Sequence, residues 1–199
     1  MELSLILSIC SFLWVIAITP GPNNMLLTAT SANFGFMPAI KLLTGTMIGM
    51  QLMLLVVAFN VGNVIRHFPS VQLLFKIAGS CYLLWFSWKI ATSPLQKFNT
   101  KMALAMPISF WQGGLLQLIN PKAWLMVLGA VASFSLAGAQ YVNSVIAMSI
   151  GMALVNIVAG LLWLCGGVFI STILRGRRAW RVFNLTMGLL TASCVLMIW

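Results

Sequence analysis

The sequence predicts an all-α integral membrane protein with six transmembrane helices, arranged as two three-helix inverted repeats with broken first helices. Hydrophobic residues make up 61% of its 199 residues and charged residues only 6%. A soluble domain carries about 25% charged residues to cover its water-facing surface. Long apolar runs divide this chain into spans, and proline-containing breaks interrupt two of those runs. These observations exclude a soluble globular protein.

The first half of the chain is expected to contain three spans of roughly 20 residues each. Residues 3–19 form the first apolar segment. We expect it to be retained as a helix, because a signal peptide needs a basic start and a small-residue cleavage site. The next spans are predicted at 39–60 and 71–91, and residues 92–107 are the most loop-like stretch. This half forms the first repeat, about 1–99.

The second half starts near Ser109 and is expected to contain three more spans. No charge occurs between Lys122 and Arg175, a run too long for one span and suited to two. The best turn within it is 138–143. A short basic loop follows at 175–181, and the last span is predicted at 182–199. This second repeat, about 100–199, completes a single transmembrane domain over residues 1–199.

Basic residues predict the orientation in the membrane. Eleven Lys and Arg stand against one acid, Glu2, and they are spread between apolar runs rather than gathered as in a nucleic-acid-binding protein. With six spans, the first, third and fifth loops lie on one side of the membrane, and they hold most of the basic residues. Because basic loops are typically cytoplasmic, this side is predicted to be cytoplasmic and both termini periplasmic. The cytoplasmic set is Lys41, Lys89, Lys97, Lys101, Arg175, Arg177, Arg178 and Arg181, against Arg66 and Lys76 on the other side.

Two breaks interrupt the first helix of each half. Thr19–Asn24 contains Pro-Gly-Pro, and Asn120–Lys122 reads Asn-Pro-Lys. Proline removes a backbone donor, and freed backbone groups in a membrane are tolerated only inside protein or along a water-filled cavity. Two such breaks at matching places are typical of an inverted-repeat transporter whose site lies near the bilayer midplane. The alternative is that each proline is only a kink.

Three pairs of positions have similar sequence separations, as a duplication requires. They are Pro22 with Pro121, Gln51 with Asn156, and Gly79 with Gly188.

Several motifs resemble the LysE/RhtB family of bacterial amino-acid exporters over the whole chain. They are residues 19–24, the GxxxG of Gly45 and Gly49, residues 82–89 and residues 120–122. Residues 88–94 and 107–111 are similar to the cysteine/O-acetylserine exporter branch. The resemblance implies secondary active export of small amino acids across the bacterial inner membrane, driven by the proton gradient or membrane potential, without a cofactor.

One position departs from the family pattern. Many relatives carry an aspartate just after the GxxxG, where this chain has Met50 followed by Gln51. A membrane-embedded carboxylate therefore cannot carry protons here.

The breaks suggest how a zwitterionic amino acid is held. Its carboxylate suits the positive end of a half-helix, with Asn23 or Asn24 as one helix cap and Asn120 before Pro121 as another. Its ammonium needs freed carbonyls or side-chain amide oxygens, and a dibasic substrate would lack a counter-ion for its second charge. The candidate substrate-binding residues are Pro20, Gly21, Pro22, Asn23, Asn24, Gln51, Gln117, Asn120, Pro121, Lys122 and Asn156.

Alternatives stay open for several of these residues. Lys122 either anchors the substrate carboxylate or replaces a coupling ion, or it donates to carbonyls freed by a break or snorkels to the interface. Gln51 and Asn156 either contact substrate or join helices by hydrogen bonds. Gly45 and Gly49 predict close helix contact within one chain or between chains, so a homo-oligomer is also open.

Enzyme chemistry is not expected. The chain has one His, His67 in an outer loop, and scattered cysteines, so no metal site of His and carboxylates is available. The expected partners are the amino-acid substrate and the lipid bilayer. The competing hypotheses are a non-transporting assembly or regulatory subunit and a channel.

Overall fold

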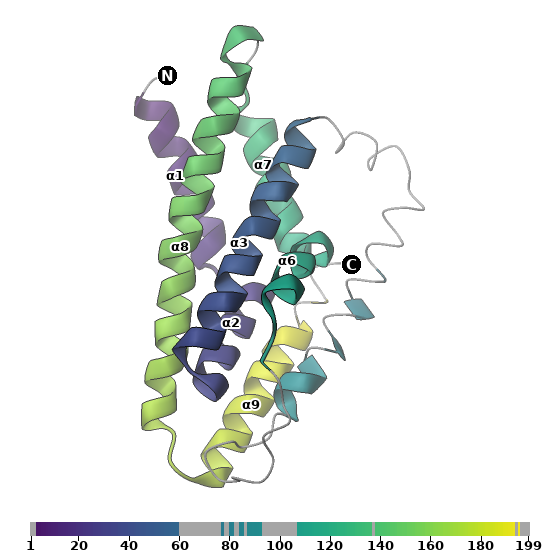
Figure 1. The fold of residues 1–199 in the computed structure, drawn as a ribbon, viewed down its shortest axis with the longest axis vertical. Helices are drawn as coiled ribbons and strands as arrows, with labels where there is room; N and C mark the ends of the chain where they lie inside the picture. The colour runs from purple at the N-terminus through teal and green to yellow at the C-terminus, as the bar shows by residue number, and fades with distance from the viewer. Residues whose placement is uncertain are drawn as a thin grey trace.

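The computed structural model describes residues 3–59, 77, 80–81, 84–85, 87–92, 107–136, 138–193 and 195, and every regular element in them is helical (Figure 1). This confirms the all-α prediction for those residues. In chain order the elements are α1 (Leu3–Ile18), α2 (Pro22–Phe34), α3 (Phe36–Ala58), α6 (Phe110–Ile119), α7 (Pro121–Phe134), the 3₁₀ turn η2 (Gly138–Gln140), α8 (Tyr141–Ile173) and α9 (Gly176–Ser193).

Several predictions fall outside the described residues. They concern most of the third span and of the loop 92–107, and the last four residues of the chain. The named residues are Arg66, His67, Lys76, Gly79, Lys97 and Lys101. The end of the third span is described: residues 87–91 are helical and pack against Gly188 of α9.

Some of the described helices have the length and surface of membrane spans. Within these residues, α3 and the segment Gly138–Ile173 are long and apolar enough to cross a membrane, and up to four spans result when each bent helix pair is one span. Exposed large apolar side chains cover their outer faces, among them Ile48 and Leu52 on α3 and Leu154 and Phe169 on α8. Such a surface suits lipid rather than water. The 33 residues of α8 extend about 50 Å, well beyond the roughly 30 Å hydrocarbon core.

Both predicted breaks are present. The axes of α1 and α2 meet at 57°, and those of α6 and α7 at 68°. Figure 1 shows that α1–α2 runs from the upper end of the molecule downward, whereas α6–α7 runs upward. Both breaks therefore lie in the middle of the molecule, between the two ends of the long helix α8.

Two clusters of buried side chains lie on either side of the breaks. One joins α1, α3, α7 and α8 and includes Leu13, Met53, Val127 and Met152. The other joins α2, α3 and α6 through Leu26, Leu42 and Leu116, with contributions from Ile90 and Ile108. α8 packs along α1, α2 and α3, so it holds both clusters together.

The GxxxG motif of α3 makes a contact within the chain. A Cβ at Gly45 would lie 2.0 Å from the carbonyl oxygen of Phe110, and one at Gly49 would lie 2.6 Å from that of Gly114. The backbones of α3 and α6 thus approach as closely as only glycine permits. The two glycines make a helix contact between the two halves of one chain, so the motif gives no support to a homo-oligomer.

The second half differs from the prediction at its basic segment. The turn predicted at 138–143 is present but shorter, because η2 leads directly into α8 at Tyr141. The prediction of a basic loop at 175–181 is wrong. α9 already begins at Gly176, so Arg177, Arg178 and Arg181 are helical. Gly176 has a φ of 81°, a conformation that favours glycine, and this lets the chain reverse within two residues.

Candidate functional site

A cavity of about 40 Å³ lies between the two helix breaks. α1, α2, α3, α7 and α8 all contribute to its wall. A second cavity of about 20 Å³ adjoins it toward α2 and α3, and the two share Ala17, Asn23, Asn24, Met50 and Asn156. The wall of the larger one is completed by Ile16, Gly21, Asn120, Lys122, Ala123 and Met126.

The first break leaves the start of α2 without a side-chain cap. The N-cap of α2 is Gly21 and Pro22 is its first residue, so the prediction that Asn23 or Asn24 caps it is wrong. The proline sets the φ angle that starts the helix before either asparagine. The backbone N–H groups of Asn23 and Asn24 consequently have no acceptor among the described residues. Such uncapped groups carry the positive end of the helix dipole.

The Asn24 side chain instead closes the end of α1. Its Nδ2 donates to the carbonyls of Ala17, at 2.9 Å, and Thr19, at 2.8 Å. Carbonyl partners can only accept, so the amide nitrogen is fixed on that side. Its Oδ1 has no donor among the described residues and belongs to a side chain that lines both cavities.

The second break is a single residue, Asn120, and it is capped. Its Oδ1 accepts from the backbone N–H of Lys122 at 3.1 Å, and Pro121 is the first residue of α7. The predicted cap is confirmed. Because a backbone N–H fixes the oxygen, the Nδ2 of this buried asparagine is the group left for the cavity.

Two contacts join the breaks to each other. The Nζ of Lys122 donates to the carbonyl of Thr19 and lies 3.5 Å from that of Pro20. Gln117, fully buried on α6, exchanges hydrogen bonds with Asn23: Nδ2 to Oε1 at 2.9 Å and Nε2 to Oδ1 at 3.1 Å. This geometry matches the alternative in which Lys122 satisfies carbonyls freed by the break, while its side chain still lines the larger cavity.

Asn156 and Gln51 have different surroundings. The Nδ2 of Asn156 donates to the carbonyl of Met152 at 2.8 Å, and the residue lines both cavities, so its Oδ1 is a second amide acceptor there. Gln51 does not line either cavity. Its Nε2 donates to the backbone carbonyl of Ser149 at 3.0 Å, and its Oε1 accepts from the side-chain hydroxyl of the same serine at 2.7 Å. Gln51 therefore joins α3 to α8.

The structure therefore brings together six of the eleven candidates. The cavity-lining candidates are Gly21, Asn23, Asn24, Asn120, Lys122 and Asn156. The remaining five line neither cavity: Pro20, Pro22, Gln51, Gln117 and Pro121.

Apolar wall residues were missed by the sequence analysis. On α3, Leu43, Thr46, Met47 and Met50 all line the smaller cavity. They stand at positions 43, 46, 47 and 50, a helical spacing that places them on one face of α3 and that could have identified them. Met50 lines both cavities and is 4% exposed.

The chemistry of the wall suits both ends of a zwitterion. Two amide oxygens, from Asn24 and Asn156, can accept from an ammonium. The N–H groups that begin α2, the Nδ2 of Asn120 and the cation of Lys122 suit a carboxylate. Across the described ranges, no group of His, Cys, Asp and Glu could hold a metal ion.

Comparison with known proteins decides the family. The model of the LysE type translocator matches residues 14–197. The chain belongs to the LysE family. It is 30% identical over 184 residues to the cysteine/O-acetylserine efflux protein of Escherichia coli (strain K12) and 32% identical to that of Salmonella typhimurium (strain LT2), with 92% of each chain covered. None of the solved structures matches it significantly. Membership in a family of LysE translocators confirms the resemblance and supports amino-acid export rather than enzyme activity.

Proposed function

We propose that this protein is a secondary active exporter of small neutral amino acids or their derivatives, such as cysteine or O-acetylserine. It works by alternating access, in the bacterial inner membrane, as one transmembrane domain of two inverted repeats, about 1–99 and 100–199. The observation that carries this proposal is the cavity between the two breaks, lined by the asparagines and Lys122 and by no carboxylate. The efflux function named for both relatives supports it.

In the proposed complex, the substrate carboxylate binds at the uncapped start of α2, beside Lys122. Both features carry positive charge and both adjoin Gly21 on the wall of the cavity. The substrate ammonium binds the amide oxygens of Asn24 and Asn156. Neutral oxygens balance one positive charge only in part, so a second ammonium, as in lysine, has no partner.

The size of the cavity fits a step in an alternating-access cycle. A water molecule needs roughly 10–15 Å³, so about 40 Å³ admits only a few water-sized groups. Substrate entry then requires the helices beside the two breaks to move relative to one another. The hydrogen bonds that cross between the breaks, at Lys122 and at Asn23 with Gln117, are the contacts that such a movement would exchange.

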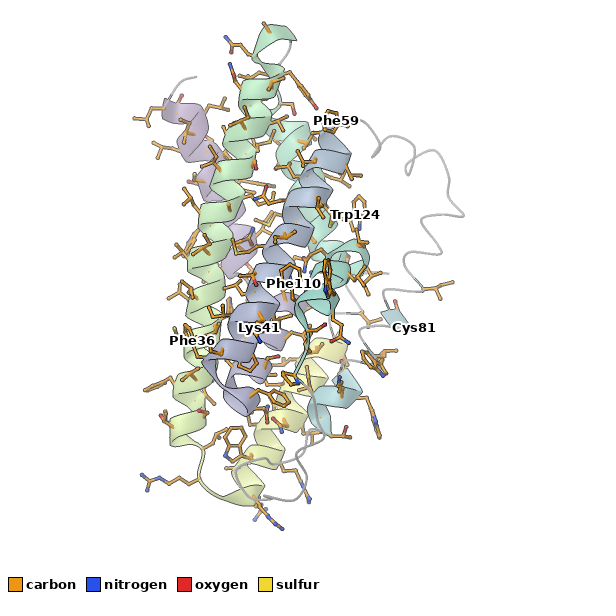
Figure 2. The ribbon with its side chains drawn as sticks, viewed as in Figure 1. Phe36, Lys41, Phe59, Cys81, Phe110 and Trp124 are labelled. Atoms are coloured by element: carbon orange, nitrogen blue, oxygen red, sulfur yellow. The ribbon has the colours of Figure 1, made fainter. Side chains whose placement is uncertain are left out.

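The proposed orientation places both termini in the periplasm. Phe36 and Lys41, near the start of α3, lie toward the lower end of the molecule, and Phe59 lies at the upper end (Figure 2). The connection between α8 and α9, which contains Arg175, is also at the lower end (Figure 1). Lys41 and Arg175 thus lie at one end (Figure 2), unlike Lys122 at the breaks, and the positive-inside rule makes that end cytoplasmic. A C-terminal reporter that is active only in the periplasm tests this orientation.

Flux in proteoliposomes tests the function. The purified protein is expected to move cysteine, serine or O-acetylserine with saturation, faster under an imposed pH gradient or potential, and not to move lysine. Absence of flux for every neutral amino acid would contradict the proposal and favour a non-transporting subunit. Flux that rises linearly with concentration would indicate a channel.

A substitution in the wall tests the charge argument. Met50→Asp places a carboxylate in the cavity, which supplies the missing counter-ion, so we expect it to confer lysine transport. Met50→Asn, nearly the same shape without the charge, is the matched control and should not do so. Lysine transport by the Asn variant, or by neither variant, would contradict the proposed position of the ammonium.

A further inference from the structure

The smaller cavity extends beyond the asparagines that it shares with the larger one. Although the surface of the whole cavity is more polar than apolar, the residues that line it alone are apolar apart from Thr46 and come from α2, α3 and α8: Leu27, Leu43, Thr46, Met47, Ala159 and Gly160. It opens beside Asn24 and Asn156, the two residues whose amide oxygens face an ammonium in the proposed complex. In an amino acid, the ammonium and the side chain are attached to the same carbon. A substrate held at those oxygens therefore directs its side chain toward this space.

We propose that the smaller cavity is the side-chain subsite and that Leu43 and Gly160 set the length of the side chain it accepts. This inference rests on the proposed export function. The cavity of about 20 Å³ holds one water-sized group, since each needs roughly 10–15 Å³. Leu43 and Gly160 lie on α3 and α8, outside the two broken helix pairs, so this end of the cavity keeps its size when the helices beside the breaks move. Among the substrates proposed above, the subsite therefore favours serine and cysteine, with one heavy atom beyond Cβ, over the longer side chain of O-acetylserine, and it disfavours leucine.

The contact between Leu43 and Gly160 defines the end wall. A Cβ added at Gly160 would lie 2.3 Å from Cδ1 of Leu43, 3.2 Å from its Cδ2 and 3.3 Å from its Cγ. The leucine side chain thus occupies the space that a side chain at 160 would fill. Its contact atoms are the far end of a flexible side chain, so a methyl group at 160 can displace them without moving backbone.

Thr46 adds a polar feature to this wall. Its hydroxyl donates to the carbonyl of Leu43 at 2.8 Å, and the side chain is 5% exposed. A hydroxyl oxygen that donates its proton still has lone pairs to accept with. The thiol of cysteine or the hydroxyl of serine can donate to it, whereas the ester of O-acetylserine cannot.

Competition measurements in proteoliposomes test the subsite. Labelled serine is exported while unlabelled serine, cysteine, O-acetylserine or leucine competes. For the wild-type protein, serine and cysteine should compete at concentrations at least about tenfold lower than O-acetylserine and leucine, as methylene-sized mismatches in apolar pockets give. Binding is followed in parallel by the ligand-dependent shift of the thermal unfolding midpoint in detergent.

Two opposite substitutions should change this ranking. Leu43→Ala removes the end wall. The concentrations at which O-acetylserine and leucine compete should therefore fall on the order of tenfold relative to that of serine. Gly160→Ala pushes Leu43 into the cavity, so cysteine and serine should compete less strongly than in the wild-type protein. Glycine, which has no side chain, serves as an added competitor and should be unaffected. In the double variant, the new methyl group fills part of the space that Leu43 leaves, and the preference for short side chains should return in part.

Matched controls separate this effect from general damage. Gly166→Ala makes the same change on the same helix in open space, with nothing within 4 Å of the added Cβ. Leu52→Ala makes the same change on α3 at a side chain that is 57% exposed. Both should keep the wild-type ranking. If Leu43→Ala fails to insert, the Gly160→Ala competition and the thermal shifts still decide the question.

The outcomes distinguish the two proposals. If both wall variants export serine as fast as the wild-type protein and rank the competitors in the same order, the subsite is overturned and the export function stands. A wild-type protein that prefers O-acetylserine or leucine over serine would also overturn the subsite. No flux and no thermal shift with any neutral amino acid would overturn the export function and the subsite with it.

Discussion

The two helix breaks have similar sequences but different structures. At the first break, α2 begins at Gly21 and Pro22 without a side-chain cap, and residues of its first turn, Asn23 and Asn24, line the cavity. At the second break, Asn120 caps α7 itself. The second half-helix pair also supplies the side chains of Lys122 and Gln117 to the first break, which meets them with backbone carbonyls and the side chain of Asn23. Breaks at similar places in the two halves of the chain therefore do not imply matching roles.

The helices that precede the breaks are also held differently. α6 meets α3 backbone to backbone at Gly45 and Gly49. α1 meets α8 through side chains: a Cβ at Gly151 would lie 3.5–3.6 Å from Ile9, Cys10 and Leu13, an ordinary contact distance. Interdigitated side chains can exchange neighbours more easily than two backbones in contact. We infer that α6 is part of a fixed frame and that α1 is the part that shifts. α2 belongs to the frame as well, because a Cβ at Gly167 of α8 would lie 2.3 Å from the carbonyl oxygen of Thr28.

The largest effect is expected from a methyl group in the fixed frame. In Gly45→Ala the added Cβ would lie 2.0 Å from a backbone carbonyl, which no rotamer change relieves. We expect a loss of about 3 kcal/mol, the upper end of the usual range for overpacking, and little folded protein. The matched variant Gly151→Ala should change stability by much less. The thermal unfolding midpoints in detergent compare the two, and equal losses would contradict the proposed difference between α1 and α6.

A smaller effect is expected from the cation that joins the breaks. Lys122→Gln removes the charge that the carbonyls of Thr19 and Pro20 share. Hydrogen bonds to charged groups contribute roughly 1.5–3 kcal/mol, which corresponds to a loss of about 10- to 100-fold in transport. The exposed residue Lys41 gives a control: Lys41→Gln, on α3, should leave flux unchanged. Normal flux in a well-inserted Lys122→Gln variant would show that the cation is dispensable.

Gly21→Ala tests the same contact from the other side. Its Cβ would lie 2.7 Å from Cδ of Lys122, so the lysine must move, while the extended backbone of residue 21 accepts alanine. The double variant with Lys122→Gln should be no worse than Lys122→Gln alone, because both changes remove one contact. Additive losses would mean that Gly21 acts independently of the lysine.

Much of the architecture could be predicted because it depends on local chemistry. Proline and asparagine at positions 120–122 dictate a helix end and a capped start, and the structure has both. The first break was predicted less well, since Pro22 and the two asparagines compete for the start of α2. Propensity alone does not say that Asn24 turns back to the carbonyls of α1. That choice depends on how α1 ends, which is a tertiary property.

The partners of the polar residues were harder to predict than their positions. Gln51 and Asn156 were predicted to occupy equivalent places in two repeats, yet one pairs with Ser149 and the other lines the cavity. Nothing in either sequence neighbourhood separates them, because the difference comes from the helix that each one faces. The basic segment was misplaced for a related reason. Arginines suggest a loop in a membrane protein, but a helix can carry them where it leaves the bilayer.

The smallest effect is expected at the capped break, and it separates a cap from a ligand. Asn120→Ala should lower the stability by about 1 kcal/mol, the usual value of a helix cap. Asn120→Ser keeps an oxygen for the N–H of Lys122 and should recover most of that loss. If Asn120 only caps α7 and does not bind substrate, the apparent KM for serine should change less in both variants than in Lys122→Gln. A KM increase in the Ser variant as large as that of Lys122→Gln, with stability restored, would instead assign the Nδ2 of Asn120 to the substrate. The two breaks would then share the binding of the substrate rather than divide binding from support.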